Sequence, residues 1–293
     1  MWSNRGQRFD ALSLTLKRGN WNWNLFAGSL VRALPGRLDQ VRYTHRISGL
    51  YGRWSPQASS WDIQPFVLWK YAPQSDESGG PDGWRSEWTS GVNATKDIGR
   101  GFSLYGELAL QYGTAVHRPL RAWAAARELR HPLPVGKHSQ FSVGLAEASG
   151  NRGASGDRAT RNSPRGTFDD LYPAAFNSCG FLVPFAWRNI RDLHAGGNWD
   201  LKRNWSLASE LHSYWLNSRS DGVYADEETW VFRNPEASSS RLGVQWSTLL
   251  AYRHSAHWNA GVGYAHFFAG PYLRESAAAA SANGAFLSFT WTP

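Results

Sequence analysis

Charged side chains at alternating positions are the residues of this chain best suited to chemistry. Arg121 and Arg127 alternate with Leu120, Ala122 and Ala124, so an extended chain places the two arginines on the face opposite the apolar residues. An arginine side chain presents a planar fork of donors that matches carboxylate and phosphate groups. The pattern therefore predicts a hydrated surface that attracts anions.

The same alternation assigns further charged and histidine side chains to this surface, which we expect to line a pore. The expected lining residues are Arg53, Lys70, Arg121, Arg127, Arg188, Asp192, His194, Glu210, His212 and Arg241. Interior carboxylates such as Glu210 and Asp192 can pair with arginine and keep passing anions from binding too tightly. For any single arginine a structural salt bridge is an equally good interpretation, so the set carries more weight than its members.

Signals for catalysis or for a metal are weak in this sequence. Cys179 is the only cysteine, which excludes an internal disulfide and argues against a cysteine-based metal cluster. There is no Ser-His-Asp or Gly-x-Ser-x-Gly arrangement. The acidic run 76–82 lacks the ligand order of an EF-hand, which favours a solvated loop over a Ca²⁺ site. We therefore expect no enzyme, no cofactor and no metal.

Charge and hydropathy narrow the class of partner. Basic residues outnumber acidic ones by 31 to 23, which gives a formal net charge of +8. No groove-reading motif or recognition helix is visible, so a polyanion other than nucleic acid is the expected partner. No window approaches the roughly 18–20 apolar residues of a membrane-spanning helix.

The elements that must position these residues are thirteen alternating stretches. In the clearest stretch, Phe102, Leu104 and Leu108 share one face while Ser103 and Glu107 share the other. Many of the 17 Trp stand near the ends of such stretches, where an amphipathic ring suits the lipid headgroup layer. The pattern predicts an all-β fold, namely a transmembrane antiparallel up-and-down β-barrel in contact with outer-membrane lipid. The expected strands lie near 8–17, 21–33, 44–54, 60–71, 86–96, 102–112, 119–129, 138–149, 188–199, 204–216, 241–252, 257–266 and 284–292.

Short and long connections alternate along the chain, which is typical of a chain that crosses a membrane back and forth. The long ones are expected at 34–43, 72–85, 113–118, 150–187, 217–240 and 267–283. A barrel with both termini in the periplasm needs an even number of strands. We therefore expect residues 1–293 to be a single barrel domain that lacks a signal peptide and about five strands at its N-terminal side.

Three sequence segments resemble the alginate-export family of outer-membrane barrels. They are Thr-Phe-Asp-Asp-Leu-Tyr-Pro at 167–173, Trp-Arg-Asn-Ile-Arg-Asp-Leu at 187–193 and Arg-Ser-Asp-Gly-Val-Tyr at 219–224, with Arg-Phe-Asp at 8–10 as a weaker match. The resemblance covers the later part of a family member. It implies a barrel of about eighteen strands in the outer membrane of a Gram-negative cell, which passes alginate or a related anionic polysaccharide or oligosaccharide through an arginine-rich lumen, with periplasmic export partners. The chain departs from the family pattern at Ala174–Cys179, at Ala186 and at its last residue, Pro293.

Two interpretations of the long loops stay open. Phe168, Asp169, Asp170 and Tyr172, with Arg219 and Asp221, can form a gate in which the carboxylates anchor the loop to lumen arginines. Alternatively, Phe168, Leu171 and Tyr172 merely fill the barrel mouth. Two other functions compete with the channel, namely a barrel hydrolase that uses loop carboxylates with His194 or His212, and a soluble carbohydrate-binding β-protein.

Overall fold

A computed structural model describes residues 8–32, 36, 38–56, 59–74, 83–136, 138–152, 163–171, 180, 182, 185–202, 204–224, 230–255, 257–277 and 280–292. The expected gate residue Tyr172, the acidic run 76–82 and Cys179 lie outside the described residues.

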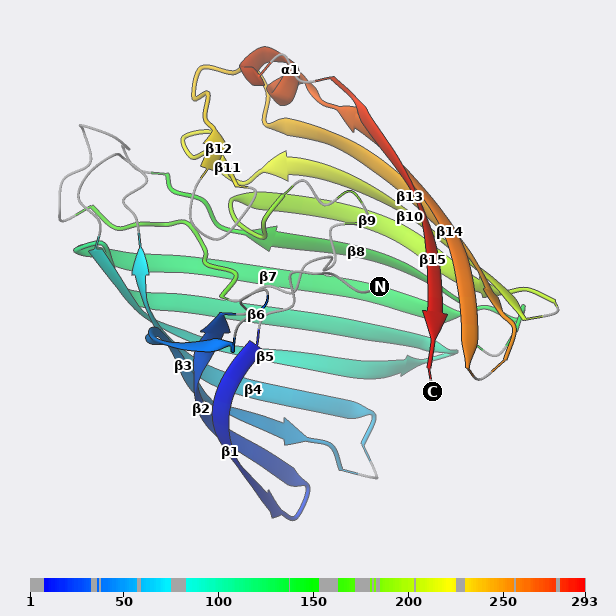
Figure 1. The fold of residues 1–293 in the computed structure, drawn as a ribbon, viewed down its shortest axis with the longest axis horizontal. Helices are drawn as coiled ribbons and strands as arrows, with labels where there is room; N and C mark the ends of the chain where they lie inside the picture. The colour runs from blue at the N-terminus through cyan, green and yellow to red at the C-terminus, as the bar shows by residue number, and fades with distance from the viewer. Residues whose placement is uncertain are drawn as a thin grey trace.

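One antiparallel sheet of thirteen strands forms the body of the molecule, and each strand pairs with its neighbour along the chain. Figure 1 shows the sheet curved into a trough, with β1 at one edge and β15 at the other. The strands of this sheet are β1 (Arg8–Arg18), β2 (Trp21–Arg32), β3 (Gln40–Trp54), β4 (Trp61–Gln74), β5 (Gly83–Gly99), β6 (Phe102–Ala115), β7 (Arg118–Pro132), β8 (Gln140–Ala148), β9 (Ile190–Asp200), β10 (Trp205–Leu216), β13 (Arg241–Arg253), β14 (Trp258–Ala269) and β15 (Ala282–Trp291). All thirteen strands expected from the alternation are present. Within the described residues, β1 and β15 do not pair with each other.

The long connections carry three small elements that the alternation did not predict. The hairpin of β11 (Val223–Tyr224) and β12 (Trp230–Phe232) lies between β10 and β13, and the helix α1 (Pro271–Ala277) lies between β14 and β15. These elements gather at one end of the strands (Figure 1). No helix among the described residues is long and apolar enough to cross a membrane.

One connection expected to be long is a tight turn. Residues 113–115 continue β6, so only Val116 and His117 separate it from β7. Both residues have positive φ, at 49° and 63°, which is the backbone of a two-residue hairpin whose twist matches the paired strands. Apolar and polar alternation does not report φ, so the sequence pattern could not reveal this turn.

The two faces of the sheet differ in chemistry. We call the face that carries residues 163–171 the inner face and the opposite face the outer face. Leucines on the outer face are solvent-exposed, such as Leu12 at 82%, Leu108 at 45% and Leu211 at 50%. Lys70, Gln111 and His212 lie on the inner face and are buried there. Exposed leucine on one face and buried polar groups on the other are the arrangement of a sheet whose outer side meets lipid.

The apolar face of β7 is turned opposite to expectation. Ala122 pairs with Gln111, so the alternate residues Leu120, Ala122 and Ala124 lie on the inner face, where they are buried. They form part of an apolar cluster with Phe168 of the long β8–β9 connection. Because alanine side chains are small, they leave room for residues 163–171 above the sheet. This packing explains why the apolar residues of β7 face inward.

Arg121 and Arg127 consequently lie on the outer face, contrary to expectation. Arg121 pairs with Tyr112, and Arg127 pairs with Gly106 between the exposed Leu104 and Leu108. A long side chain on an apolar face can extend its charged end beyond the apolar residues beside it.

Arg241 is a second correction, and its cause is a bulge. The pairing of β10 with β13 shifts between Tyr214 and Trp215, so Arg241 pairs with Trp215 and Leu242 is left over. Leu242 is buried, whereas Arg241 lies exposed on the outer face beside Trp215. A bulge reverses the alternation on one side of it, so every residue beyond it changes face.

Candidate functional site

Asp169 is the centre of a buried ion-pair cluster on the inner face. Its carboxylate accepts hydrogen bonds from Lys70 Nζ at 2.8 Å, from a terminal nitrogen of Arg188 at 2.7 Å and from Arg85. Glu87 adds a second carboxylate, with an oxygen 3.0 Å from Arg85. We call Lys70, Arg85, Glu87, Asp169 and Arg188 the Asp169 cluster.

Strand register brings these residues together from distant parts of the chain. Lys70 on β4 pairs directly with Glu87 on β5, and Arg85 is two positions away on the same face. The side-chain amide of Gln111 on β6 makes two hydrogen bonds to the backbone of Asp169. Its Nε2 donates to the Asp169 carbonyl at 2.6 Å, and its Oε1 accepts from the Asp169 N–H at 2.7 Å. The loop segment 163–171 is therefore tied to three consecutive strands.

Electrostatics keep the Asp169 carboxylate ionised despite its burial. Burial by itself raises the pKa of a carboxyl group, but the positive charges of Arg85, Lys70 and Arg188 outweigh it and hold the pKa of Asp169 well below its usual range. The side chains of all four residues are no more than 6% exposed. The three cations are thus neutralised by protein carboxylates and do not form an open column of positive charge.

The three sequence segments that suggested the family meet beside this cluster. Arg188 also bonds Asp170, with its Nε 3.1 Å from the carboxylate. The side chain of Asn189 donates to the carbonyls of Ser218 and Gly222 at 2.9 and 3.0 Å. The residues of 167–170, 187–189 and 218–222 therefore form one buried assembly. Its hydrogen bonds link the two longest connections of the chain.

Asp221 and Arg219, both expected in a gate, have structural contacts. Asp221 accepts hydrogen bonds at 2.6 Å from the N–H of Asn151 and from the hydroxyl of Thr167. The Arg219 guanidinium donates to the carbonyl of Ala237 at 2.7 Å. Both residues hold the loops in place, and Phe168 is buried in the apolar cluster beneath them.

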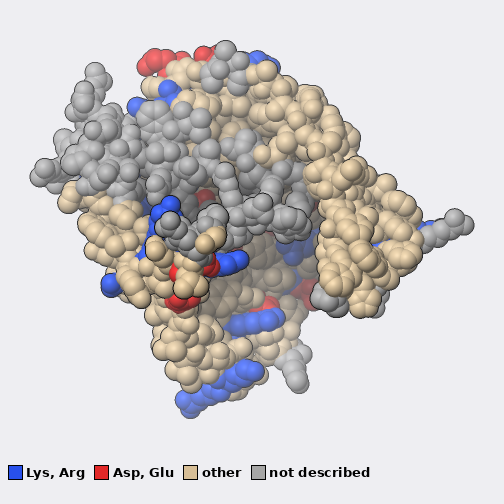
Figure 2. Space-filling model, viewed as in Figure 1, with Lys and Arg blue, Asp and Glu red and all other residues tan. Residues whose placement is uncertain are grey.

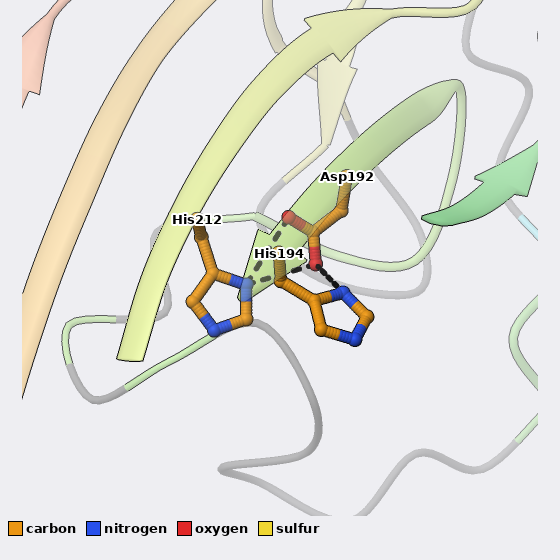
Figure 3. Close-up of side chains that lie close together, drawn as sticks. All are labelled: Asp192, His194 and His212. Atoms are coloured by element: carbon orange, nitrogen blue, oxygen red, sulfur yellow. Dashed lines mark hydrogen bonds and ion pairs between the residues drawn. The ribbon is translucent and has the colours of Figure 1, made fainter. Parts of the chain in front are cut away.

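A second cluster lies on β9 and β10 of the inner face. Asp192 is fully buried, and its carboxylate lies 2.9 Å from His212 Nδ1 and 3.4 Å from His194 Nδ1. Figure 3 shows the two imidazole rings on either side of this carboxylate. Glu210 is 3.6 Å from His212 Nε2. The sequence suggested that Asp192 and Glu210 pair with arginine, but their ionic neighbours here are histidines.

A hollow of about 580 Å³ lies on the inner face, and Asp170 and His194 are among the residues that line it. Its lining residues include Tyr51, Tyr105, Arg130, Phe168 and His194. Figure 2 shows the hollowed side of the molecule, with basic and acidic side chains on its wall. The volume falls within the roughly 300–1,000 Å³ that is common for small-molecule sites. Aromatic rings next to charged groups suit a polar, ring-shaped solute.

The lining residues expected from the sequence are only partly brought together. Lys70, Arg188, Asp192, His194, Glu210 and His212 lie on or against the inner face in the two clusters. Arg53 lies on the inner face near the short-turn end, 2.5 Å from Asp62.

Sequence reasoning missed Arg85, Glu87, Gln111, Glu128 and Arg130. The strand now seen as β5 begins at Gly83, three residues before its expected start. Had the alternation been followed upstream, Trp84 and Trp88 would have marked the outer face and Arg85 and Glu87 the inner one.

One solved structure among the similar proteins supports this architecture. The crystal structure of Pseudomonas aeruginosa OccK11 (OpdR) is similar to this chain with a TM-score of 0.55 and 14% identity, over 97% of this chain and 70% of that one. The NanC porin aligns with a TM-score of 0.38 and 8% identity, over 85% of this chain and 94% of the other. None of the curated proteins matches. The family described as alginate export matches residues 1–286, and this chain therefore belongs to the alginate export family.

Proposed function

We propose that this protein is an outer-membrane channel that passes an anionic polysaccharide or oligosaccharide, such as alginate. The family match over residues 1–286 and the porin-like fold support a channel. The observation that carries the proposal is the contrast between the faces of one sheet, with exposed Leu108 and Leu211 outside and buried ionic clusters inside. Such a sheet is suited to lipid on one side and to water on the other.

The inner face offers a passing anion weak and repeated contacts. The buried cations Lys70, Arg85 and Arg188 are neutralised by carboxylates, so a polymer meets them only as a polar wall. Arg130 and Arg53 are more exposed, at 41% and 57% of their side chains, and each is paired with a carboxylate. Partly neutralised arginines attract a carboxylated sugar without trapping it, which transport requires.

The segment 163–171 acts as a gate in this proposal. Asp169 and Asp170 anchor it to the wall, and Phe168 fills the apolar seat formed by Leu120, Ala122 and other inner-face residues. Asp221 of the next loop accepts a hydrogen bond from Thr167 of this segment, and Arg219 holds that loop by its bond to Ala237. The two interpretations drawn from the sequence are thus compatible, because one segment is both anchored by its carboxylates and packed by its aromatic ring.

The thirteen strands belong to a closed barrel in this proposal. The outward Leu12 of the edge strand β1 is 82% exposed and Leu287 of β15 is 85% exposed. Backbone groups at an open edge find no hydrogen-bond partner in lipid, so both edges need further strands. About five more strands would give the eighteen that the family resemblance implies.

The competing functions have less support. A soluble sandwich needs a second sheet against the apolar face, and the described residues contain only one large sheet and one two-stranded hairpin. A hydrolase that uses Asp169 as a proton donor needs a protonated carboxyl, whereas the pKa of Asp169 is held well below its usual range.

Planar-bilayer recordings of the purified protein test the channel directly. We expect anion-selective currents that oligomers of a uronic acid reduce in a concentration-dependent way, and that neutral oligosaccharides of the same length leave unchanged. Cation-selective currents that are insensitive to the uronate would overturn the proposal.

A further inference from the structure

The side chains of Asp192, His194 and His212 converge as the ligands of a metal ion do. Asp192 and His194 are two residues apart on β9, so both project from the same face. His212 on β10 pairs directly with His194 across the ladder. One potential ligand atom from each of the three side chains lies within 4.8 Å of the other two. Two paired strands fix this arrangement, so it does not depend on a loop.

Both imidazoles aim the same nitrogen at the same carboxylate. Asp192 Oδ2 is 2.9 Å from His212 Nδ1 and 3.4 Å from His194 Nδ1, and a dashed line from each ring meets at this oxygen in Figure 3. Two buried nitrogens of the pair, His194 Nδ1 and His212 Nε2, have a carboxylate oxygen at 3.4 Å and 3.6 Å but no well-formed hydrogen bond to a described residue. Buried ring nitrogens without a hydrogen bond are costly in a purely structural cluster.

A carboxylate also stands behind each imidazole. Glu210 lies 3.6 Å from His212 Nε2, and Glu128 on β7 lies 3.9 Å from His194 Nε2. Histidine ligands in metal sites usually donate their second ring N–H to a carboxylate or carbonyl, which fixes the ring orientation and strengthens the ligand. The cluster thus has both the ligand atoms and the outer partners of a metal site.

We propose that Asp192, His194 and His212 bind one divalent transition-metal ion such as Zn²⁺. Two imidazoles and one carboxylate favour Zn²⁺, Ni²⁺ or Cu²⁺ over Mg²⁺ and Ca²⁺, which prefer oxygen ligands alone. The ion takes the place of the protons between the Nδ1 atoms and Asp192, so binding releases protons. His194 lines the hollow on the inner face, which gives the ion a path to the site.

Isothermal titration of the detergent-solubilised protein with Zn²⁺ alone tests the site. We expect one ion per chain and a release of protons, seen as a dependence of the heat on the ionisation enthalpy of the buffer. His194→Gln should abolish this binding. Glu210→Gln should weaken it about 10- to 100-fold, because Glu210 acts only through His212. Glu210 has an exposed side chain, so its substitution should leave the fold intact.

The matched control is the double variant His254→Gln/His257→Gln, which removes exposed histidines from the β13–β14 turn. It should bind Zn²⁺ as the unmodified protein does. Circular dichroism identifies any variant that fails to fold, and if His194→Gln is one of them, Glu210→Gln decides. The proposal fails if the unmodified protein binds no Zn²⁺, if both His194→Gln and Glu210→Gln bind it unchanged, or if binding is lost with His254 and His257.

Discussion

Removing the charge of Asp169 is the sharpest perturbation of the proposed gate. The unmodified assembly sets three cations (Lys70, Arg85 and Arg188) against three carboxylates (Asp169, Glu87 and Asp170). Asp169→Asn leaves three cations with two carboxylates in a site where the side chains are at most 6% exposed. Removing one partner of a buried ion pair costs about 3–5 kcal/mol.

The loop is the part of the molecule that can relieve this imbalance. Undocking of residues 163–171 exposes the cations to water, so the population of the undocked state should rise roughly 100-fold or more, at about 1.4 kcal/mol for each factor of ten. In planar bilayers we expect Asp169→Asn channels to have a higher mean conductance and more frequent fluctuations. Limited proteolysis should cut the 150–187 connection faster than in the unmodified protein.

Two further variants separate the charge effect from a general loss of stability. Asp62→Asn breaks the more exposed pair with Arg53, which is worth about 0–1 kcal/mol, and should leave conductance unchanged. The double variant Asp169→Asn/Lys70→Met restores equal numbers of cations and carboxylates. It should therefore bring the mean conductance and the frequency of fluctuations part of the way back to those of the unmodified protein. If Asp169→Asn behaves like Asp62→Asn, the anchor has no part in gating and this reasoning is wrong.

Three other outcomes follow from the same contacts. Arg127→Leu should raise the free energy of unfolding in lipid vesicles by up to about 2 kcal/mol in denaturant titrations, because the arginine lies on the outer face; a loss of anion selectivity would instead assign Arg127 to the pore. Asn189→Ala removes the donor to the carbonyls of Ser218 and Gly222, which should destabilise the loop by about 1–3 kcal/mol. Protease should therefore cleave 217–240 faster; an unchanged cleavage rate would contradict this prediction. Lowering the pH from 7 to 5 should leave Asp169 itself ionised, because a lowered pKa makes the Asp169 contribution complete above the ordinary carboxyl pKa of about 4 and lost only as the pH falls through the lowered value; a protonated-carboxyl infrared band that grows over this range and is absent from Asp169→Asn would count against this.

Alternation of apolar and polar residues was enough to predict the sheet. All thirteen strands were found, because one face of the sheet is apolar and successive residues of a strand alternate between the two faces. The prediction of which β7 residues face outward was wrong, and the reason is local. The apolar residues of β7, Leu120, Ala122 and Ala124, pack in one cluster with Phe168 of the long connection. In the sequence, apolar residues that pack against a loop look the same as apolar residues on the outer face.

The clusters were less accessible to sequence reasoning than the strands. Lys70, Arg188 and Asp169 were each named, but their meeting depends on contacts over 99 and 19 residues of chain. The spacing of Asp192 and His194 already indicated a shared face. The third partner, His212, depends on the register between β9 and β10, which no local pattern reveals. Arg241 was misplaced because a bulge shifts the alternation by one position.

The ion pairs between Asp169 and the inner face have a consequence for the order in which the chain folds. Lys70 and Arg85 are 99 and 84 residues from Asp169 in the chain, so the pairing of β4 with β5 does not by itself bring the carboxylate to them. Until Asp169 docks, these two cations must stay hydrated on the inner side of β4 and β5, because burying an unpaired charge costs a large amount of free energy. Docking of the loop is therefore a late step in folding, and in the proposed barrel the inner face of β4 and β5 should stay hydrated until it occurs.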